Sequence, residues 1–214
     1  MSPATSSRAP ASSWAPPRRR QDGKPGADRM RTTSTPFLAL MRGLNVGGQN
    51  VIGKHDLVRC FEQLGFDSVR TYIQSGNVLF RSDESRVAAL SGAIEAALSE
   101  RLSNRVRVVV LSRARYRAAV ASAPDDWGRN DERKHNALFT LRGFTPRRVI
   151  EQLPVPKGEI ETVSSGPGVI FWSISKLHQT RTTWMKVAAA PAYQHVTVRN
   201  HRTVFKLREL LEAL

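Results

Sequence analysis

The sequence has few of the features that stabilise secreted or membrane proteins. Cys60 is the single cysteine among 214 residues, so an internal disulfide is impossible and the disulfide-rich secreted class is excluded. Apolar runs such as 106–111 and 187–190 are far shorter than the roughly 20 residues that a membrane-spanning helix needs. We therefore expect a cytoplasmic protein with no membrane partner.

Acidic residues are also scarce. The chain has 18 Asp and Glu against 33 Lys and Arg, which gives a formal charge of +15. Residues 1–34 hold seven basic and two acidic residues (+5), and residues 35–214 hold 26 and 16 (+10). This excess favours an anionic small molecule or nucleic acid as partner, although arginines solvated on helix surfaces would give the same total.

The first 34 residues show neither strand nor helix periodicity. Ser, Ala, Pro and Arg dominate them, and Trp14 is their only aromatic residue. Such a segment buries too little apolar surface to offset the entropy of ordering it, so we predict a disordered basic tail over 1–34. The tail has no apolar core of a secretory signal. We expect translation to begin at Met30, five residues before the first strand region.

From residue 35 the pattern changes to strands and helices. Apolar and β-prone runs predict four strands, and apolar residues at helical spacing predict two helices. Gln74-Ser75-Gly76-Asn77 is a turn-forming sequence, Gly65 is a helix stop signal and Ser82 is expected to cap the second helix. The predicted strands are 37–41, 69–73, 78–81 and 106–111, and the predicted helices are 54–64 and the segment after Ser82.

The same order recurs after residue 111. Ser112 is expected to cap a linking helix that reaches about Ser122, and Thr145-Pro146 is a strong helix start signal. The predicted strands are 136–141, 160–163, 169–174 and 196–199, and further helices are expected through Trp184 and Val187 and at the C-terminus.

Each part therefore has the order βαββαβ. This order predicts an α+β fold, a duplicated ferredoxin-like plait whose two lobes span 35–111 and 112–214, with a linking helix and a C-terminal helix. In a plait with strand order 4-1-3-2, the loop after the first strand and the hairpin between the second and third strands emerge at the same edge.

The glycine-rich loop at that edge is the leading candidate site. Glycines between a strand and a helix let the backbone approach a ligand closely, and N–H groups near a helix N-terminus favour an anion. We predict that an anionic small ligand, a nucleotide or a sugar phosphate, binds here; the alternative is that the glycines only form a tight turn. The predicted residues are Arg42, Gly43, Asn45, Gly47, Gly48, Gln74, Ser75, Gly76 and Asn77.

A second basic cluster is predicted in the second lobe. The ends of its third and fourth strands share one edge, where a phosphate or carboxylate could be held, although some of these residues could simply begin the last helix. The cluster comprises Ser175, Lys176, Arg199, Asn200, Thr203 and Lys206.

Three segments carry a family resemblance. Residues 42–48 read RGLNVGG, residues 72–78 read YIQSGNV and residues 197–207 read TVRNHRTVFKL. They resemble the RGINVGG, YIQSGNV and TxRNWxTVxKL blocks of a bacterial domain-of-unknown-function family, DUF1697. The resemblance covers about residues 35–214 and implies a duplicated ferredoxin-like fold without an established activity. His201 stands where the family usually has Trp, which puts an aromatic surface at that point in question.

Catalytic and metal motifs are missing from the sequence. The five histidines have no paired ligand spacing, and neither CxxC nor GxSxG occurs, so we expect no metal site and identify no cofactor. Gly48 to Lys54 nearly spells a P-loop, but His55 replaces the hydroxyl that would bind Mg²⁺. RNA-recognition modules share the βαββαβ order, yet Phe37 and Phe80 are more typical of a core than of a base-stacking surface. A nucleic-acid-binding module and an enzyme of unidentified reaction stay as alternatives.

Overall fold

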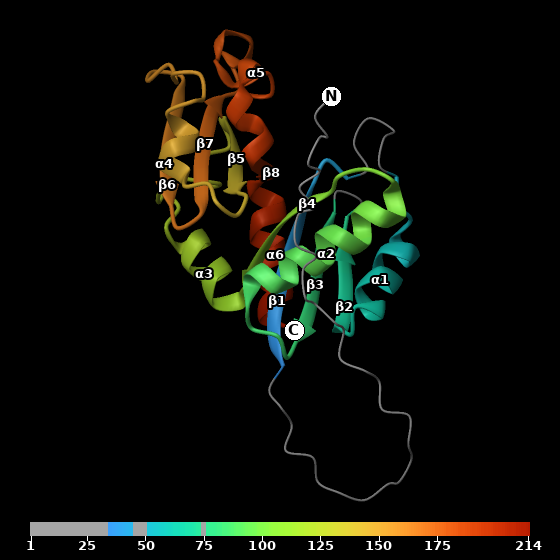
Figure 1. Cartoon of the computed structure of the whole chain (residues 1–214). Helices are drawn as coiled ribbons and strands as arrows, with labels where there is room; N and C mark the ends of the chain where they lie inside the picture. The colour runs from blue at the N-terminus through green and yellow to red at the C-terminus, as the bar shows by residue number, and fades with distance from the viewer. Residues whose placement is uncertain (1–33, 45–50, 74–75) are drawn as a thin grey trace, which may run out of the picture.

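The computed structural model describes residues 34–44, 51–73 and 76–214, so the tail predicted over 1–34 lies almost entirely outside it. The described residues form two four-stranded antiparallel sheets and six α-helices (Figure 1). The first sheet has the order β2-β3-β1-β4 and the second has the order β6-β7-β5-β8. None of the described helices is both long enough and apolar enough to cross a membrane.

The elements follow the predicted order along the chain. In the first sheet the strands are β1 (Thr35–Arg42), β2 (Asp67–Tyr72), β3 (Asn77–Ser82) and β4 (Arg107–Ser112). In the second sheet they are β5 (Arg133–Thr140), β6 (Glu161–Gly166), β7 (Val169–Ser175) and β8 (Val196–Asn200). The α-helices are α1 (Lys54–Gln63), α2 (Val87–Leu102), α3 (Arg113–Ala121), α4 (Pro146–Ile150), α5 (Trp184–Val187) and α6 (His201–Glu212), and two 3-10 turns lie at Gln179–Arg181 and Pro191–His195.

Three layers of apolar side chains hold these elements together. Helices α1 and α2 pack on one face of the first sheet, and α4, α5 and the turn before β8 pack on one face of the second. The remaining faces of both sheets enclose α3 and α6, and Figure 1 shows α6 running between the two sheets. This arrangement explains the continuous apolar sequence of β1: Phe37 faces the first layer, Leu38 faces the middle layer, and both are buried.

Most predicted helix boundaries are confirmed. The hydroxyl of Ser112 accepts from the N–H of Arg115 at the start of α3, and the hydroxyl of Thr145 accepts from the N–H of Arg148 at the start of α4. Gly65, just after α1, has a φ of +82°, as a helix stop requires.

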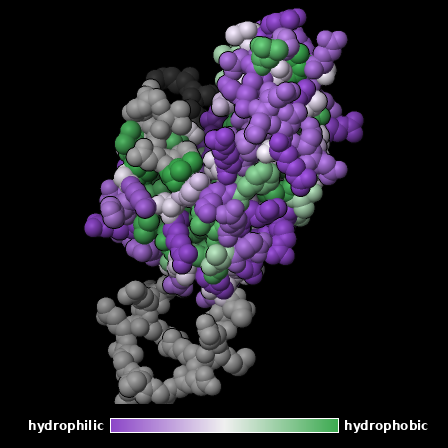
Figure 2. Space-filling model, turned by 180° about the vertical axis from the view of Figure 1, so that it is seen from behind, coloured by the Kyte–Doolittle hydropathy of each residue, from purple (hydrophilic) through white to green (hydrophobic). Residues whose placement is uncertain are grey.

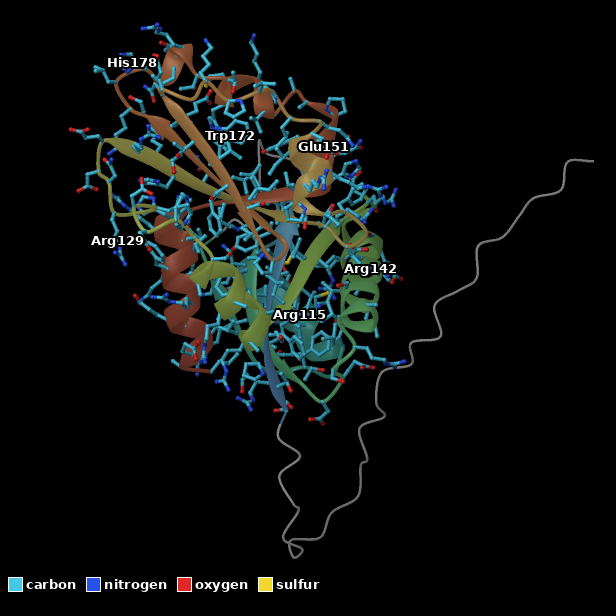
Figure 3. All side chains as sticks on the ribbon, turned by 90° about the vertical axis from the view of Figure 1, so that its left-hand side faces the viewer. Arg115, Arg129, Arg142, Glu151, Trp172 and His178 are labelled. Carbon is cyan, nitrogen blue, oxygen red and sulfur yellow. The ribbon has the colours of Figure 1, made fainter. Side chains whose placement is uncertain are left out.

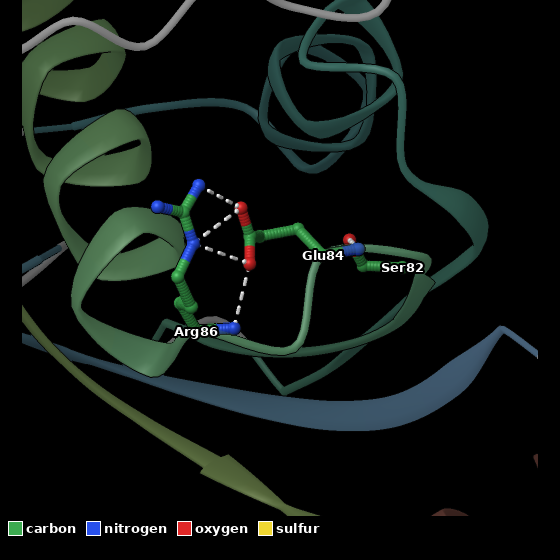
Figure 4. Close-up of polar contacts among 3 residues, drawn as sticks. All are labelled: Ser82, Glu84 and Arg86. Atoms are coloured by element: carbon green, nitrogen blue, oxygen red, sulfur yellow. Dashed lines mark hydrogen bonds and ion pairs between the residues drawn. The ribbon is translucent and has the colours of Figure 1, made fainter.

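The predicted cap at Ser82 is wrong. Its hydroxyl accepts from the N–H of Glu84 within the loop, and α2 begins only at Val87 (Figure 4). The carboxylate of Glu84 instead accepts from the N–H and the guanidinium of Arg86, and this hydrogen bonding lowers the pKa of Glu84 to about 2. Glu84 therefore draws the chain into a tight turn before the helix can start.

The helix predicted through Trp184 and Val187 is a single turn. Residues 179–195 form two 3-10 turns with the short α5 between them. The N–H groups of Thr183 and Trp184 donate to the buried carboxylate of Glu161, and these hydrogen bonds hold the segment on the second sheet without a longer helix.

Candidate functional site

The glycine-rich edge is described only in part. Of its nine predicted residues, Asn45, Gly47, Gly48, Gln74 and Ser75 lie outside the described residues. The N–H of Met41 donates to the carbonyl oxygen of Gly76 at 2.8 Å, so the end of β1 and the hairpin lie side by side, as the topology predicted.

Asn77 belongs to a buried network rather than to an open surface. It is fully buried, and its Nδ2 donates to the carbonyl oxygen of Tyr72 at 3.0 Å. Its Oδ1 accepts from Nε of Arg199, 122 residues further along the chain, at 2.5 Å. Arg199, only 7% exposed, thus reaches from β8 of the second sheet to the hairpin of the first.

The guanidinium of Arg199 donates to oxygens of both sheets. NH1 donates to Oγ1 of Thr197 at 2.9 Å and to the carbonyl oxygen of Val198 at 2.7 Å. NH2 donates to the carbonyl oxygens of Met41 at 3.0 Å and Gly76 at 3.2 Å. We refer to Arg199, Asn77, Thr197 and these carbonyls as the Arg199 network. Oγ1 of Thr197 also donates to the carbonyl oxygen of Met41 at 3.0 Å, so two side chains of β8 connect the sheets.

Arg199 was predicted in the second basic cluster, and that placement is wrong. In β8, Arg199 pairs with Ala137 and Val198 pairs with Leu138, so the two neighbours point to opposite faces of the sheet. The Ala137 face is the one that meets the first sheet. Burial lowers the pKa of Arg199 to about 10. This value is still well above 7, so the side chain stays charged at neutral pH.

Arg42 also turns toward the second sheet. Its NH2 donates to the carbonyl oxygen of Tyr193 at 3.5 Å, and its guanidinium lies over the Tyr193 ring, 5.6 Å from the centroid. The described part of the glycine-rich edge is therefore mostly the seam between the two sheets.

Gly76 and Gly43 allow a matched prediction at this seam. Both have positive φ, +72° and +68°, which a Cβ disfavours by about 1 kcal/mol or more. A Cβ at Gly76 would lie 2.9 Å from Cβ of Met41, whereas a Cβ at Gly43 would meet no described atom within 4 Å. We expect Gly43→Ala to cost about 1 kcal/mol and Gly76→Ala a further 1 to 3 kcal/mol from overpacking. Equal losses in chemical denaturation would contradict the close contact.

Three more members of the predicted second cluster have local roles. Nζ of Lys206 pairs with the carboxylate of Glu209 at 2.8 Å on the exposed side of α6. The N–H of Thr203 donates to Oδ1 of Asn200, the N-cap of the helix. The hydroxyl of Ser175 accepts from the N–H of His178, which lies at the outer tip in Figure 3. These local contacts account for all three residues, and none of them lines the pocket that contains Lys176 and Asn200.

Lys176 and Asn200 do come together, in a pocket that we call the histidine pocket. It lies at the end of the second sheet where β5 begins and β8 ends, and its volume is about 310 Å³. The outer surface of this sheet and its helices is largely hydrophilic (Figure 2). The pocket is lined by Asp131, Arg133, Lys134, His135, Asn136, Lys176, Trp184, Asn200, His201 and Arg202.

The charge of the pocket is strongly positive. Four of its lining residues are Lys or Arg and one is Asp. Nζ of Lys134 donates to Oε1 of Gln179 at 2.6 Å, and NH1 of Arg133 donates to Oγ1 of Thr162 at 3.3 Å. Lys176 and Arg202 are exposed and form no ion pair with a described residue. These two cations are thus free to meet an anion.

Two histidines form the inner wall of the pocket. His135 is buried; its Nε2 lies 2.9 Å from the carbonyl oxygen of Asn130 and its Nδ1 lies 2.8 Å from the hydroxyl of Ser173. Since a carbonyl only accepts, Nε2 carries the proton. The His201 ring lies 5.4 Å from the His135 ring, and its buried Nδ1 has no hydrogen-bond partner among the described residues. Burial, with help from His135, lowers the pKa of His201. The site therefore keeps a neutral imidazole beside its cations.

His201, which stands where the family resemblance leads us to expect Trp, lies among aromatic rings. The rings of Trp127 and Phe205 lie at 6.3 Å from the His201 ring in edge-to-face arrangements. His201 thus brings a polar nitrogen into an aromatic environment.

Glu161, which no sequence motif marks, anchors the segment that carries the pocket residue Trp184. It is 1% exposed, and its carboxylate accepts from the N–H groups of Lys157, Thr183 and Trp184 at 3.0, 2.9 and 3.0 Å. It also accepts from Nε1 of Trp172, a residue seen in the interior of the second sheet in Figure 3. Burial by itself would raise the pKa of Glu161, but these hydrogen bonds outweigh it and hold the pKa below its usual value. The only sequence signal that pointed to Glu161 was its place as a lone acidic residue in the predicted strand 160–163.

Among the described residues, no group of three or more His, Cys, Asp or Glu side chains is placed to hold a metal ion. The lining of the pocket offers hydrogen-bonding groups and positive charge.

Comparison with known proteins identifies relatives without a defined activity. A family model described as "Protein of unknown function (DUF1697)" matches residues 35–171. The conserved bacterial protein SP0830 from Streptococcus pneumoniae has a similar structure, with a TM-score of 0.74 and 30% sequence identity, covering 83% of this chain and 98% of that chain. No curated protein matches the sequence.

Proposed function

Because the chain belongs to the DUF1697 family, whose description names no activity, we propose a function from the geometry alone: the histidine pocket binds a small phosphate-bearing ligand. The observation that carries this proposal is the gathering of Arg133, Lys134, Lys176 and Arg202 around one pocket, with Asp131 as the only acidic residue in its lining.

The start of α6 supports the same proposal. Asn200 caps this 12-residue helix by bonding the N–H of Thr203, and both Asn200 and His201 line the pocket. The first N–H groups of a helix have no acceptor within the helix and carry partial positive charge. The N–H groups of His201 and Arg202 occupy these positions, so they suit a phosphate oxygen.

The buried Nδ1 of His201 provides a third argument. A buried polar nitrogen without a partner among the described residues costs free energy, roughly 1 to 3 kcal/mol. A ligand that reached this nitrogen with a hydrogen-bonding group would recover part of that cost. Lys and Arg side chains then supply the stronger charge-assisted bonds.

The glycine-rich edge stays a prediction for an anionic ligand. Its described residues Asn77 and Gly76 are engaged by Arg199, which favours the histidine pocket as the first site to test.

We also propose that the two sheets with their helices are two copies of the ferredoxin-like plait. The support is the repeated order of elements and the matching strand orders β2-β3-β1-β4 and β6-β7-β5-β8. In this reading α3 links the copies and α6 closes the space between them.

Removing two pocket cations should weaken phosphate binding. We expect Lys176→Ala with Arg202→Ala to lower the affinity for inorganic phosphate at least tenfold, because each charge-assisted hydrogen bond contributes about 1.5 to 3 kcal/mol. The melting temperature should change little, since both side chains are exposed. Isothermal titration calorimetry at two salt concentrations measures the affinity.

A matched control is available in Arg115→Ala with Arg142→Ala. Both arginines are exposed and labelled in Figure 3, and the pair removes the same charge. Arg142 follows the end of β5 opposite to the pocket. The control pair should change phosphate affinity less than twofold, because distant exposed charges are screened at about 0.15 M salt. Equal weakening by both pairs, or no phosphate binding by the wild type, would refute the proposal.

A further inference from the structure

The histidine pocket has room for more than a phosphate group. Its volume of about 310 Å³ falls at the lower end of the range of small-molecule sites, roughly 300 to 1,000 Å³. Inorganic phosphate would leave most of this space to solvent. A larger group attached to the phosphate can therefore occupy the same pocket.

Trp184 supplies a flat apolar wall that is fixed before any ligand arrives. The residue is half-buried, and its ring packs edge-to-face on Trp172 with 5.7 Å between centroids. Its backbone N–H donates to Glu161 at 3.0 Å, so both ends of the residue are held. A partly exposed indole held in this way loses little conformational entropy when a planar ring stacks on it.

Asn136 adds the means to recognise the edge of such a ring. It lies on β5 between Trp172 of β7 and Asn200 of β8. Asn200 already uses its Oδ1 to cap α6, whereas none of the described residues bonds the side chain of Asn136. Its carboxamide offers one acceptor and two donors, a pattern that matches the donor and acceptor edge of a nucleobase.

We infer that the phosphate-bearing ligand of the histidine pocket is a nucleotide, whose base stacks on Trp184 and whose phosphate lies against Lys176, Arg202 and the start of α6. This inference rests on the proposed function. A sugar phosphate would use the cations equally well, but it has no planar ring for the indole and no base edge for Asn136.

Titration calorimetry of the full chain tests the inference with four probes: adenosine monophosphate, uridine monophosphate, ribose 5-phosphate and inorganic phosphate. At least one nucleotide should bind about tenfold more tightly than ribose 5-phosphate, as expected for one stacked base. Trp184→Ala should abolish that advantage and change the affinity for inorganic phosphate less than twofold. Trp184→Phe should retain most of it, and nucleotide binding should quench the Trp fluorescence of the wild type more than that of Trp184→Phe.

The failure of this inference is distinguishable from that of the proposed function. Equal affinities for nucleotides and ribose 5-phosphate, with phosphate still bound, overturn the nucleotide and leave the anion site standing. Absence of binding by all four probes overturns both. If Trp184→Ala melts at a lower temperature, Asn136→Ala takes its place and should weaken nucleotide binding without affecting phosphate; no change in nucleotide binding counts against the inference.

A free nucleotide and the phosphorylated end of a nucleic-acid strand share this chemistry. Competition by a short single-stranded oligonucleotide, with and without a 5′-phosphate, separates the two sources. Stronger binding of the mononucleotide supports a free ligand, and stronger binding of only the phosphorylated oligonucleotide supports a strand end. Equal competition by both oligonucleotides contradicts the inference, because the phosphate would then contribute nothing.

Discussion

Arg199→Ala is expected to lower the free energy of unfolding by about 3 to 5 kcal/mol, because it removes buried hydrogen bonds that join the two sheets and leaves a cavity in their place. Arg199 donates to Oδ1 of Asn77, to Oγ1 of Thr197 and to the carbonyl oxygens of Met41 and Gly76. These acceptors lie on both sheets, so the loss should also loosen the contact between them. Chemical denaturation monitored by circular dichroism gives the change in free energy.

A conservative variant and a distant variant separate the effect of the lost hydrogen bonds from the effect of the lost charge. Arg199→Lys keeps the charge but has a single nitrogen in place of the planar fork, and we expect it to restore less than half of the loss. Arg142→Ala removes an exposed charge and should stay within about 0.5 kcal/mol of the wild type. A double-mutant cycle with Asn77→Ala should give a coupling energy of about 1 kcal/mol or more. Additive effects would show that the Arg199 network contributes nothing as a unit.

Glu161→Gln is the second large effect that we expect, a loss of about 2 to 3 kcal/mol at pH 7. The carboxylate of Glu161 accepts from three backbone N–H groups and from the side chains of Trp172 and Thr183. A glutamine of the same shape brings an NH₂ group, a donor, among these donors. Urea denaturation monitored by circular dichroism gives the loss.

The sign of the pH dependence follows from the lowered pKa of Glu161. A carboxyl whose pKa is lower in the folded than in the unfolded state binds its proton more weakly when folded. Its stabilising contribution is complete above the unfolded pKa of about 4.3 and is lost as the pH falls through the folded pKa. The difference in stability between wild type and Glu161→Gln should therefore be greatest above about pH 5 and shrink below about pH 4.

An exposed carboxylate serves as the control for this titration. Glu151→Gln removes a charge from an exposed residue that is labelled in Figure 3. Among the described residues, Glu151 forms an ion pair only with exposed Arg147. It should change stability by less than about 0.5 kcal/mol. A difference between wild type and Glu161→Gln that is constant from pH 3 to pH 7 would contradict the proposed ionisation of Glu161. The same experiment also tests what holds Trp184 in place, because the N–H of Trp184 donates to the carboxylate of Glu161.

Local sequence signals predicted much of the framework. The order of strands and helices, the caps at Ser112 and Thr145 and the stop at Gly65 agree with the structure. Each of these depends on residues within a few positions of each other, where backbone geometry and hydrogen bonding are decided locally. The failure at Ser82 is also local: its hydroxyl accepts from the N–H of Glu84 and the carboxylate of Glu84 accepts from Arg86, and these loop contacts move the start of the helix to Val87.

The candidate site was predicted only in outline. Connectivity brought Lys176 and Asn200 to one edge, and both line the histidine pocket. His135, His201 and Trp184 were not predicted there, because they join the pocket from a strand and two helices separated by up to 66 residues. Glu161 was missed because its donors come from the segment around 183, which folds back onto the sheet.

The sequence by itself thus determined the order of elements, the continuous apolar run of β1 and the excess of positive charge. The tertiary structure alone decided which charges are exposed and which are buried. Arg199 and Asn200 are neighbours in the chain, yet the alternation of the strand sends one into the seam between the sheets and the other to the pocket. Which face of that strand would meet another sheet depends on the packing of α3 and α6, and no local signal carries that information.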